Sequence, residues 1–283
     1  MKVGFIGLGA MGRPMALHLQ KGGHELLVWA RRPESAVGLP ATLCATPAEL
    51  GRRCEVVFTI ITSSADVEAV ALGADGLIEG MAPDSVLVDC STIAPDAARR
   101  VAAELAGKGI HMLDAPVSGG AQGAIDATLA IMAGGDAAVL ERVRPLLDCL
   151  GKRIVHIGPS GAGQVAKACN QMIMVAAIEA VAEALRLAAA AGADCAKVKQ
   201  ALAGGSAASR VLDVMGERMV KRDFAAGIEA RLHHKDFGLV LEAARKSGVP
   251  LPLTATVAQQ LNALMAKGWG KDDTASLLRV LEH

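Results

Sequence analysis

A glycine-rich turn near the N-terminus constrains the fold of this chain more than any other feature. The glycines of a G-x-G-x-x-G pattern follow the apolar segment Lys2–Ile6 and precede a helix-compatible stretch at residues 13–19. In such a turn the first glycine permits a tight bend, the second lets the backbone approach a pyrophosphate, and the third lets helix and strand pack closely. The helix N-terminus also favours an anion. The turn therefore predicts a dinucleotide site with contacts from Gly7, Leu8, Gly9, Ala10, Met11 and Gly12.

The chain has a different sequence pattern in each half. Before residue 157, short apolar segments alternate with alanine-rich segments of helical length, which is typical of parallel strands joined by helices. We predict strands at residues 2–6, 25–29, 56–61, 86–89, 111–114, 129–132 and 154–156. Apolar side chains at helical spacing then predict helices at 164–191, 194–203, 209–221, 233–247 and 254–267. The prediction is an α/β fold with a Rossmann-type dinucleotide-binding domain (residues 1–161) and an all-α domain (residues 162–280).

Composition excludes several other classes of protein. Lys plus Arg and Asp plus Glu both total 29, so no net field attracts nucleic acid or an anionic membrane. No apolar run is long enough to span a bilayer and no signal peptide is evident, so we expect a cytoplasmic protein. The six cysteines form no C-x-x-C pair, which indicates neither a metal site nor a disulfide framework. Leu281-Glu282-His283 resembles the remnant of an affinity tag.

The residues after the second predicted strand bear on which dinucleotide binds. An acidic side chain about twenty residues beyond the glycine turn would accept the ribose hydroxyls of NAD. Here the chain reads Trp29-Ala30-Arg31-Arg32-Pro33. Two guanidinium groups suit a 2′-phosphate, so NADP is favoured, although paired surface arginines are often only solvated charges and NAD stays an alternative. At the ends of the next strands we expect cofactor contacts from Ile61, Thr62, Ser63, Val67 and Thr92.

A polar group on the long predicted helix bears on proton transfer. Hydride transfer to a carbonyl leaves a developing alkoxide, which needs a proton donor within hydrogen-bond reach. The chain contains no tyrosine, which excludes dehydrogenases that use a Tyr–Lys pair, so His or Lys remains. Lys167, Asn170 and Gln171 stand at i, i+3 and i+4 and project from one helix face. A substrate carboxylate and hydroxyl would satisfy these groups if the face is buried; a solvent-exposed polar face is the alternative.

Together these segments resemble the β-hydroxyacid dehydrogenase family over essentially the whole chain. Asp114-Ala115-Pro116-Val117-Ser118-Gly119-Gly120 is similar to its substrate-binding signature, and Gly161, Gly163, Lys167 and Asn170 match its G-x-G-x-x-x-K-x-x-N segment. The resemblance implies a 6-phosphogluconate dehydrogenase-like arrangement of domains, with Lys167 as catalytic acid/base. It also implies that Lys235 contacts the cofactor and helps to close the site near the nicotinamide. The implied substrate contacts are Ser118, Gly119, Gly120, Asn170, Gln171 and Thr92.

Departures from the family pattern bear on the substrate. Thr62 stands where the family often has Pro, Ala127 where Gly is common, and Gln171 where Asn is frequent. Gln171 and the segment 178–185 are similar to members that reduce tartronate semialdehyde to D-glycerate, which is the substrate that the resemblance favours. The alternatives are 3-hydroxyisobutyrate, succinic semialdehyde, L-threonate and sulfolactaldehyde.

Two other classes of protein share parts of this pattern. Imine reductases use a similar two-domain plan but usually lack the lysine, and non-enzymatic relatives have lost it, whereas this chain retains Lys167. The predicted helix at 164–191 is hydrophobic on more than one face. We therefore expect a homodimer or homotetramer.

Overall fold

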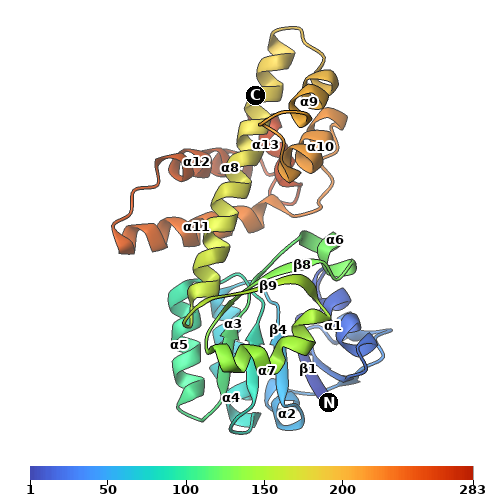
Figure 1. Cartoon of the computed structure of the whole chain (residues 1–283), viewed down its shortest axis with the longest axis vertical. Coiled ribbons are helices and arrows are strands. Elements are labelled where there is room, and N and C mark those ends of the chain that lie inside the picture. Colours follow the sequence, from blue (N-terminus) through green and yellow to red (C-terminus); the bar gives the residue numbers. More distant parts are fainter. Residues whose placement is uncertain (283) are drawn as a thin grey trace. The chain divides into compact units, whose positions relative to one another are not determined.

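The computed structural model describes residues 1–282 and contains two compact units, one ending at Lys167 and one beginning at Ala168 (Figure 1). The division lies inside helix α8 (Ala162–Ala190), which begins where we predicted the second domain to start. The first turn of α8 belongs to the first unit, because the Gln164 backbone amide donates a hydrogen bond to the Asp114 carboxylate and the Gln164 side chain donates one to the Ser91 carbonyl oxygen. The tag prediction lies partly outside the described residues, since residue 283 is not among them.

Within the described residues, the first unit is built on a nine-stranded sheet of order β3-β2-β1-β4-β5-β6-β8-β7, with β9 paired to β8. β1, β2, β4, β5 and β6 are parallel, and β8 runs antiparallel to β6 and β7. The strands are β1 (Lys2–Ile6), β2 (Glu25–Trp29), β3 (Thr42–Leu43), β4 (Val56–Thr59), β5 (Val86–Asp89), β6 (His111–Asp114), β7 (Val117–Ser118), β8 (Leu129–Gly134) and β9 (Gly151–Gly158).

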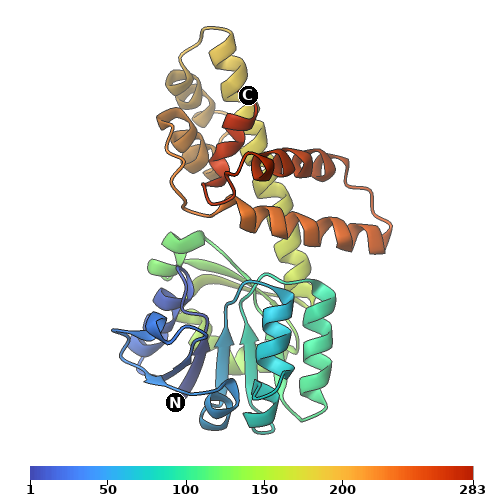
Figure 2. The same cartoon turned by 180° about the vertical axis from the view of Figure 1, so that it is seen from behind.

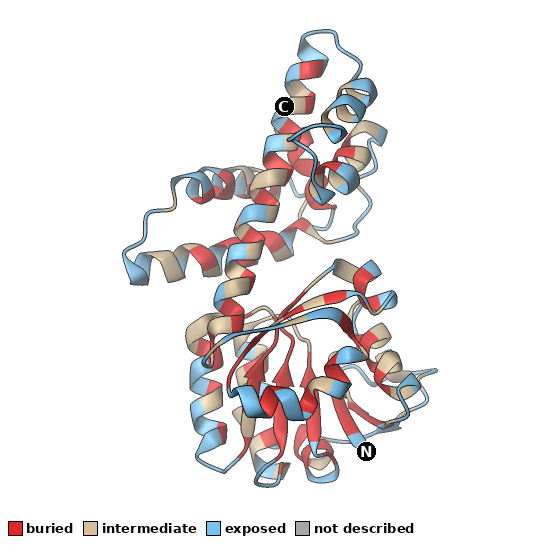
Figure 3. Ribbon diagram, in the orientation of Figure 1, coloured by how far each residue is buried: buried red, intermediate tan, exposed pale blue. Residues whose placement is uncertain are grey.

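Helices cover both faces of this sheet, because successive strand residues point to opposite sides. Val3 and Phe5 of β1 pack in one core with residues of α1 and α7, and Val57 and Leu87 pack in a second core with residues of α2, α4 and α5. Figure 2 shows this sheet and its helices from behind, and Figure 3 shows that much of the sheet is buried. The helical elements are α1 (Gly12–Lys21), η1 (Pro33–Ala36), α2 (Pro47–Arg53), α3 (Ser64–Leu72), α4 (Leu77–Gly80), α5 (Pro95–Ala106), α6 (Gly120–Ile125) and α7 (Ala137–Asp148).

The strand order locates a ligand site in the first unit. β1 lies between β2 and β4, so the chain leaves β1 toward one edge and later returns on its other side. In open parallel sheets, ligands bind outside the carboxyl ends of the strands at this switch point. The glycine-rich turn directly follows β1 and therefore lies there.

The second unit is helical, as predicted. Val175 and Ile178 of α8 share a core with Phe237 of α11 and Leu261 of α12. Its other elements are α9 (Cys195–Ala203), the π-helical turn η2 (Leu212–Gly216), α10 (Glu217–Lys221), α11 (Ala230–Ser247), α12 (Pro252–Ala266), η3 (Thr274–Ser276) and α13 (Leu277–Val280). Among the helices of residues 1–282, none combines the length and apolar character that crossing a bilayer requires. The predicted fold class is confirmed.

Candidate functional site

The glycine-rich turn has the geometry that a pyrophosphate requires. Gly7 has φ +103°, and a Cβ added to Gly12 would lie 1.7 Å from the Gly7 carbonyl oxygen, so this close packing of strand and helix tolerates no side chain. A Cβ on Gly9 would meet nothing within 4 Å, which leaves open space beside the backbone there. No side chain caps the N-terminus of α1 at Met11, and the positive end of the helix dipole there favours an anion. These residues fit a dinucleotide.

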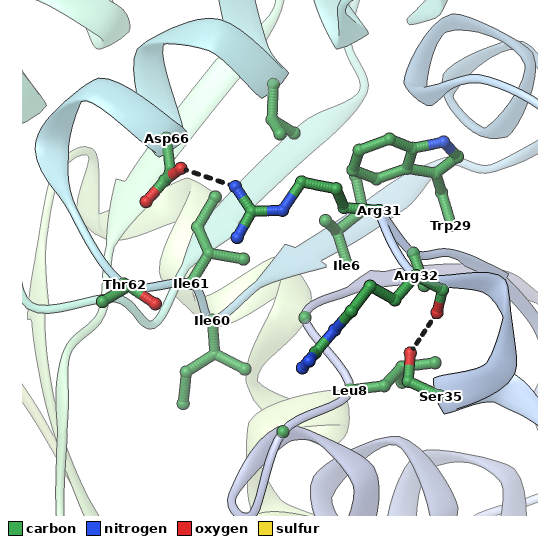
Figure 4. Close-up of a pocket in the computed structure, with 14 residues that line it drawn as sticks. Ile6, Leu8, Trp29, Arg31, Arg32, Ser35, Ile60, Ile61, Thr62 and Asp66 are labelled. Atoms are coloured by element: carbon green, nitrogen blue, oxygen red, sulfur yellow. Dashed lines mark hydrogen bonds and ion pairs between the residues drawn. The ribbon is translucent and has the colours of Figure 1, made fainter. Parts of the chain in front are cut away.

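A pocket of about 220 Å³ opens beside this turn (Figure 4). It brings together seven of the predicted cofactor residues, which are Gly7, Leu8, Gly9, Arg31, Arg32, Ile61 and Thr62. Its other lining residues were not predicted, and these are Ile6, Trp29, Ala30, Ser35, Ile60, Asp66 and Val70. The end of β2 thus presents two cations to the pocket, as the argument for a 2′-phosphate requires.

Asp66 adds an acidic group to this otherwise cationic pocket. Its Oδ1 lies 3.3 Å from Arg31 Nη1 (Figure 4). Its Oδ2 accepts a hydrogen bond of 2.7 Å from the Ser63 hydroxyl. The Arg31 side chain is 80% exposed, so this surface ion pair holds it weakly and leaves it able to meet a ligand. The S-x-x-D spacing of Ser63 and Asp66, which is typical of a capping box at a helix N-terminus, could have identified Asp66 from the sequence. In the structure the Asp66 amide donates to the Ser63 hydroxyl, as that motif requires.

Arg13 fixes the loop that follows β2. Its guanidinium donates hydrogen bonds of 2.8 Å to the carbonyl oxygens of Ser35 and Val37. The Ser35 hydroxyl in turn donates to the carbonyl oxygen of Arg32 at 2.7 Å. The pocket wall beside the two arginines is therefore held in place before any ligand arrives.

The predicted residues after β4 and β5 have different positions. Ser63 caps α3, whereas Val67 is buried in a small core with Ile93, and neither lines the pocket. The hydroxyl of Ser91 accepts a hydrogen bond of 2.9 Å from the Ile61 amide, which joins the loops that follow the two strands. Thr92 is the next residue, so this loop presents it beside the end of β5.

The segment predicted to bind substrate forms a strand, a glycine turn and the start of a short helix. Ser118 ends β7, Gly119 has a φ of +138° directly before α6, and Gly120, the first residue of α6, has a φ of +64°. These are conformations that side chains with a Cβ rarely adopt, so the turn requires glycine. Asp114, the first residue of the segment, is instead buried at the end of β6.

The carboxylate of Asp114 caps the helix that carries Lys167. Its Oδ1 accepts a hydrogen bond of 2.7 Å from the Gly161 amide, and its Oδ2 accepts one of 2.9 Å from the Gln164 amide. Burial raises the pKa of Asp114 to about 6, although these two bonds act in the opposite direction. A Cβ on Gly163 would lie 2.4 Å from the Asp114 carbonyl oxygen, so glycine is needed for this close approach.

Lys167 lies in the second turn of α8 and is 8% exposed. Within the second unit, the Asn170 side-chain amide donates to Gln171 Oε1 at 2.9 Å, and Gln171 Nε2 donates to Asp236 Oδ2 at 2.6 Å. Lys235 Nζ lies 3.0 Å from Asp236 Oδ1. Lys167 and Gln171 are buried, so the alternative of a solvent-exposed face is wrong for both. Lys235 belongs to the second unit, and its contact with the cofactor stays a prediction.

Metal chemistry has no evident site in the part of the chain that is described. No group of three or more His, Cys, Asp or Glu side chains within residues 1–282 is arranged to hold an ion.

Comparisons with known proteins identify both halves of the chain. Residues 2–158 match the family described as the NAD binding domain of 6-phosphogluconate dehydrogenase, and residues 161–281 match that described as NAD-binding of NADP-dependent 3-hydroxyisobutyrate dehydrogenase. The 2-hydroxy-3-oxopropionate reductase of Escherichia coli is 43% identical over 100% of this chain and 97% of its own. The NAD-dependent L-serine dehydrogenase of Pseudomonas aeruginosa is 36% identical over 99% of this chain and 98% of its own.

Solved structures agree with the sequence matches. The structure of 3-hydroxyisobutyrate dehydrogenase from Mycobacterium tuberculosis with L-serine has a TM-score of 0.91 and 31% sequence identity, covering 100% of this chain and 99% of that chain. The family resemblance drawn from the sequence is thereby confirmed. The chain belongs to the 3-hydroxyisobutyrate dehydrogenase-like family, the β-hydroxyacid dehydrogenases, and is an NAD(P)-dependent oxidoreductase that acts on CH–OH groups.

Proposed function

We propose that this enzyme reduces tartronate semialdehyde to D-glycerate and prefers NADPH. The observation that carries the substrate assignment is the 43% identity with the 2-hydroxy-3-oxopropionate reductase over the whole chain. Relatives named for L-serine and for 3-hydroxyisobutyrate are also similar over the full length, which keeps 3-hydroxyisobutyrate as an alternative of the same chemical class. The sequence resemblance adds succinic semialdehyde, L-threonate and sulfolactaldehyde as further alternatives.

In the proposed reaction, Lys167 acts as the general acid. The glycine turn at Gly7 and Gly9, with Arg31 and Arg32, would hold a nicotinamide dinucleotide, which would supply the hydride for the aldehyde carbon. The ammonium of Lys167 gives a proton to the nascent alkoxide oxygen, so an O–H bond forms as an N–H bond breaks. Ser118 and the amides of Gly119 and Gly120 offer hydrogen-bond donors for the substrate carboxylate, and Asn170 and Gln171 orient the hydroxyl.

A panel of aldehydes tests the substrate assignment. We expect kcat/KM for tartronate semialdehyde to exceed that for succinic semialdehyde, for sulfolactaldehyde and for methylmalonate semialdehyde, the aldehyde that corresponds to 3-hydroxyisobutyrate, by about tenfold or more. The reason is that polar sites discriminate strongly against analogues that leave their groups unpaired. A higher kcat/KM for any of the other aldehydes, measured with the same cofactor, would reassign the substrate within the family.

The arginines after β2 provide a test of the cofactor preference. Removing both in Arg31→Ala/Arg32→Ala is expected to raise KM for NADPH by about 10- to 100-fold. This corresponds to about 1.4–2.8 kcal/mol lost for the two guanidinium groups together, because solvent screens their contacts with a phosphate. KM for NADH should change less than threefold. Arg52→Ala, which removes an exposed arginine of α2 outside the pocket, is the matched control. Equal losses with both dinucleotides would remove the basis for an NADP preference.

We also propose a cytoplasmic homodimer or homotetramer. Support for assembly comes from the exposed face of α8, where Ile173 is 73% and Leu187 72% exposed. Apolar side chains of this size on one helix face favour burial against another subunit.

A further inference from the structure

The side chain of Gln164 connects the helix that carries Lys167 with the loop that carries Thr92. Its Oε1 accepts a hydrogen bond of 3.1 Å from the Ile93 amide, and its Nε2 donates one of 2.8 Å to the Ser91 carbonyl oxygen. The two backbone groups flank Thr92, so the carboxamide pairs with this loop as a neighbouring strand would. Gln164 is 2% exposed, and both bonds are buried.

The loop that carries Thr92 is also hydrogen-bonded to the wall of the cofactor pocket. Ser91 accepts from the amide of Ile61, which lines that pocket. Hydrogen bonds therefore run from the pocket wall through Ser91 to Gln164. On the other side of Gln164, its own backbone amide is held by the buried carboxylate of Asp114.

Gln164 and Lys167 stand at i and i+3 on α8, one helical turn apart. Residues at this spacing lie on the same face, and the helix rises about 4.5 Å between them. A helical turn is stiff, so the position of its first residues determines where Lys167 lies. Catalysis is sensitive to such placement, because a shift of about 1 Å can cost about 100-fold in rate.

We propose that Gln164, with its backbone amide held by Asp114, is a positioning residue that sets Lys167 and Thr92 in register with the cofactor pocket. The inference rests on the proposed role of Lys167. The proposed role needs both hydrogen bonds of the Gln164 side chain, and neither glutamate nor methionine can form both. Glutamate lacks the donor for the Ser91 carbonyl, and methionine lacks both hydrogen-bonding groups.

The test is Gln164→Met, which retains the shape of the side chain and removes both bonds. We expect kcat to fall about 10- to 100-fold, while the Kd for NADPH, measured by its fluorescence in a titration, changes less than threefold. Asp136→Ala is the matched control, because Asp136 caps α7 in the same unit by accepting from the amides of Ala138 and Val139. The thermal midpoint of Asp136→Ala should fall by about as much as that of Gln164→Met, but its kcat should stay at the parental value.

A second variant keeps the inference testable if Gln164→Met does not fold. Asp114→Asn retains one acceptor oxygen for the first turn of α8 and should lower kcat several-fold with little change in the Kd for NADPH. Gln164→Met or Asp114→Asn with parental kcat, alongside an inactive Lys167→Ala, would overturn the positioning role alone. An active Lys167→Ala would overturn the proposed function.

Discussion

Lys167→Ala is expected to lower kcat for the aldehyde by about 10²- to 10⁴-fold, the range that a positioned general acid contributes. The physical reason is that the alkoxide would form without a proton donor in a place from which water is largely excluded, since Lys167 is 8% exposed. The loss should be in kcat, because the proton is transferred in the transition state and not on binding. Steady-state rates with saturating NADPH measure it.

Two further variants are controls for Lys167→Ala. One tests whether a positive charge alone is sufficient for catalysis, and the other tests whether removing any lysine lowers kcat. Lys167→Arg keeps a positive charge but holds its proton too tightly to donate it, so its kcat should also fall well below the parent. Lys108→Ala, which removes an exposed lysine from the same unit, should leave kcat unchanged. A Lys167→Ala protein whose kcat stays within threefold of the parent would exclude this residue as the acid.

The sequence was sufficient for the parallel core of the fold. β1, β2, β5 and β6 have the predicted bounds, because each is a short apolar segment that ends at a turn or polar residue. The predicted strand 56–61 was too long, since the Ile61 amide donates to the Ser91 hydroxyl and leaves the ladder after Thr59. The two-residue strands β3 and β7 were missed, because alternation needs a longer segment to be visible.

The candidate site could be predicted only where a local pattern encodes it. The glycines of the first turn could be predicted, because Gly7 and Gly12 are in contact and are also close together in the sequence. The roles of Asp114 and Gln164 could not be predicted, because their hydrogen bonds join residues that are 47 to 73 positions apart in sequence. Such contacts exist only once the sheet has brought the ends of β5 and β6 beside the first turn of α8.

A buried carboxylate in the second unit should make stability depend on pH. Glu179 of α8 is 4% exposed, and neither of its oxygens has a hydrogen-bond partner among the described residues. Burial, followed by repulsion from Glu183, raises the pKa of Glu179 from an ordinary value of 4.5 to about 7. The folded protein thus keeps a proton that the unfolded chain has already lost. The associated stability is fully present below pH 4.5 and is lost as the pH rises through about 7.

Glu179→Gln should therefore stabilise the second unit at pH 8 by about 3 kcal/mol, because each unit of pKa displacement corresponds to about 1.36 kcal/mol. Below pH 4.5 the gain should be close to zero, since both states of the parent are then protonated. Urea denaturation followed by the fluorescence of Trp269, in a Trp29→Phe background, reports on the second unit. Asp213→Asn, which changes an exposed carboxylate of η2 in the same unit, is the control and should change stability by about 0.5 kcal/mol or less at both pH values. A Glu179→Gln protein whose stability differs from that of the parent by the same amount at both pH values would show that this carboxylate does not titrate as proposed.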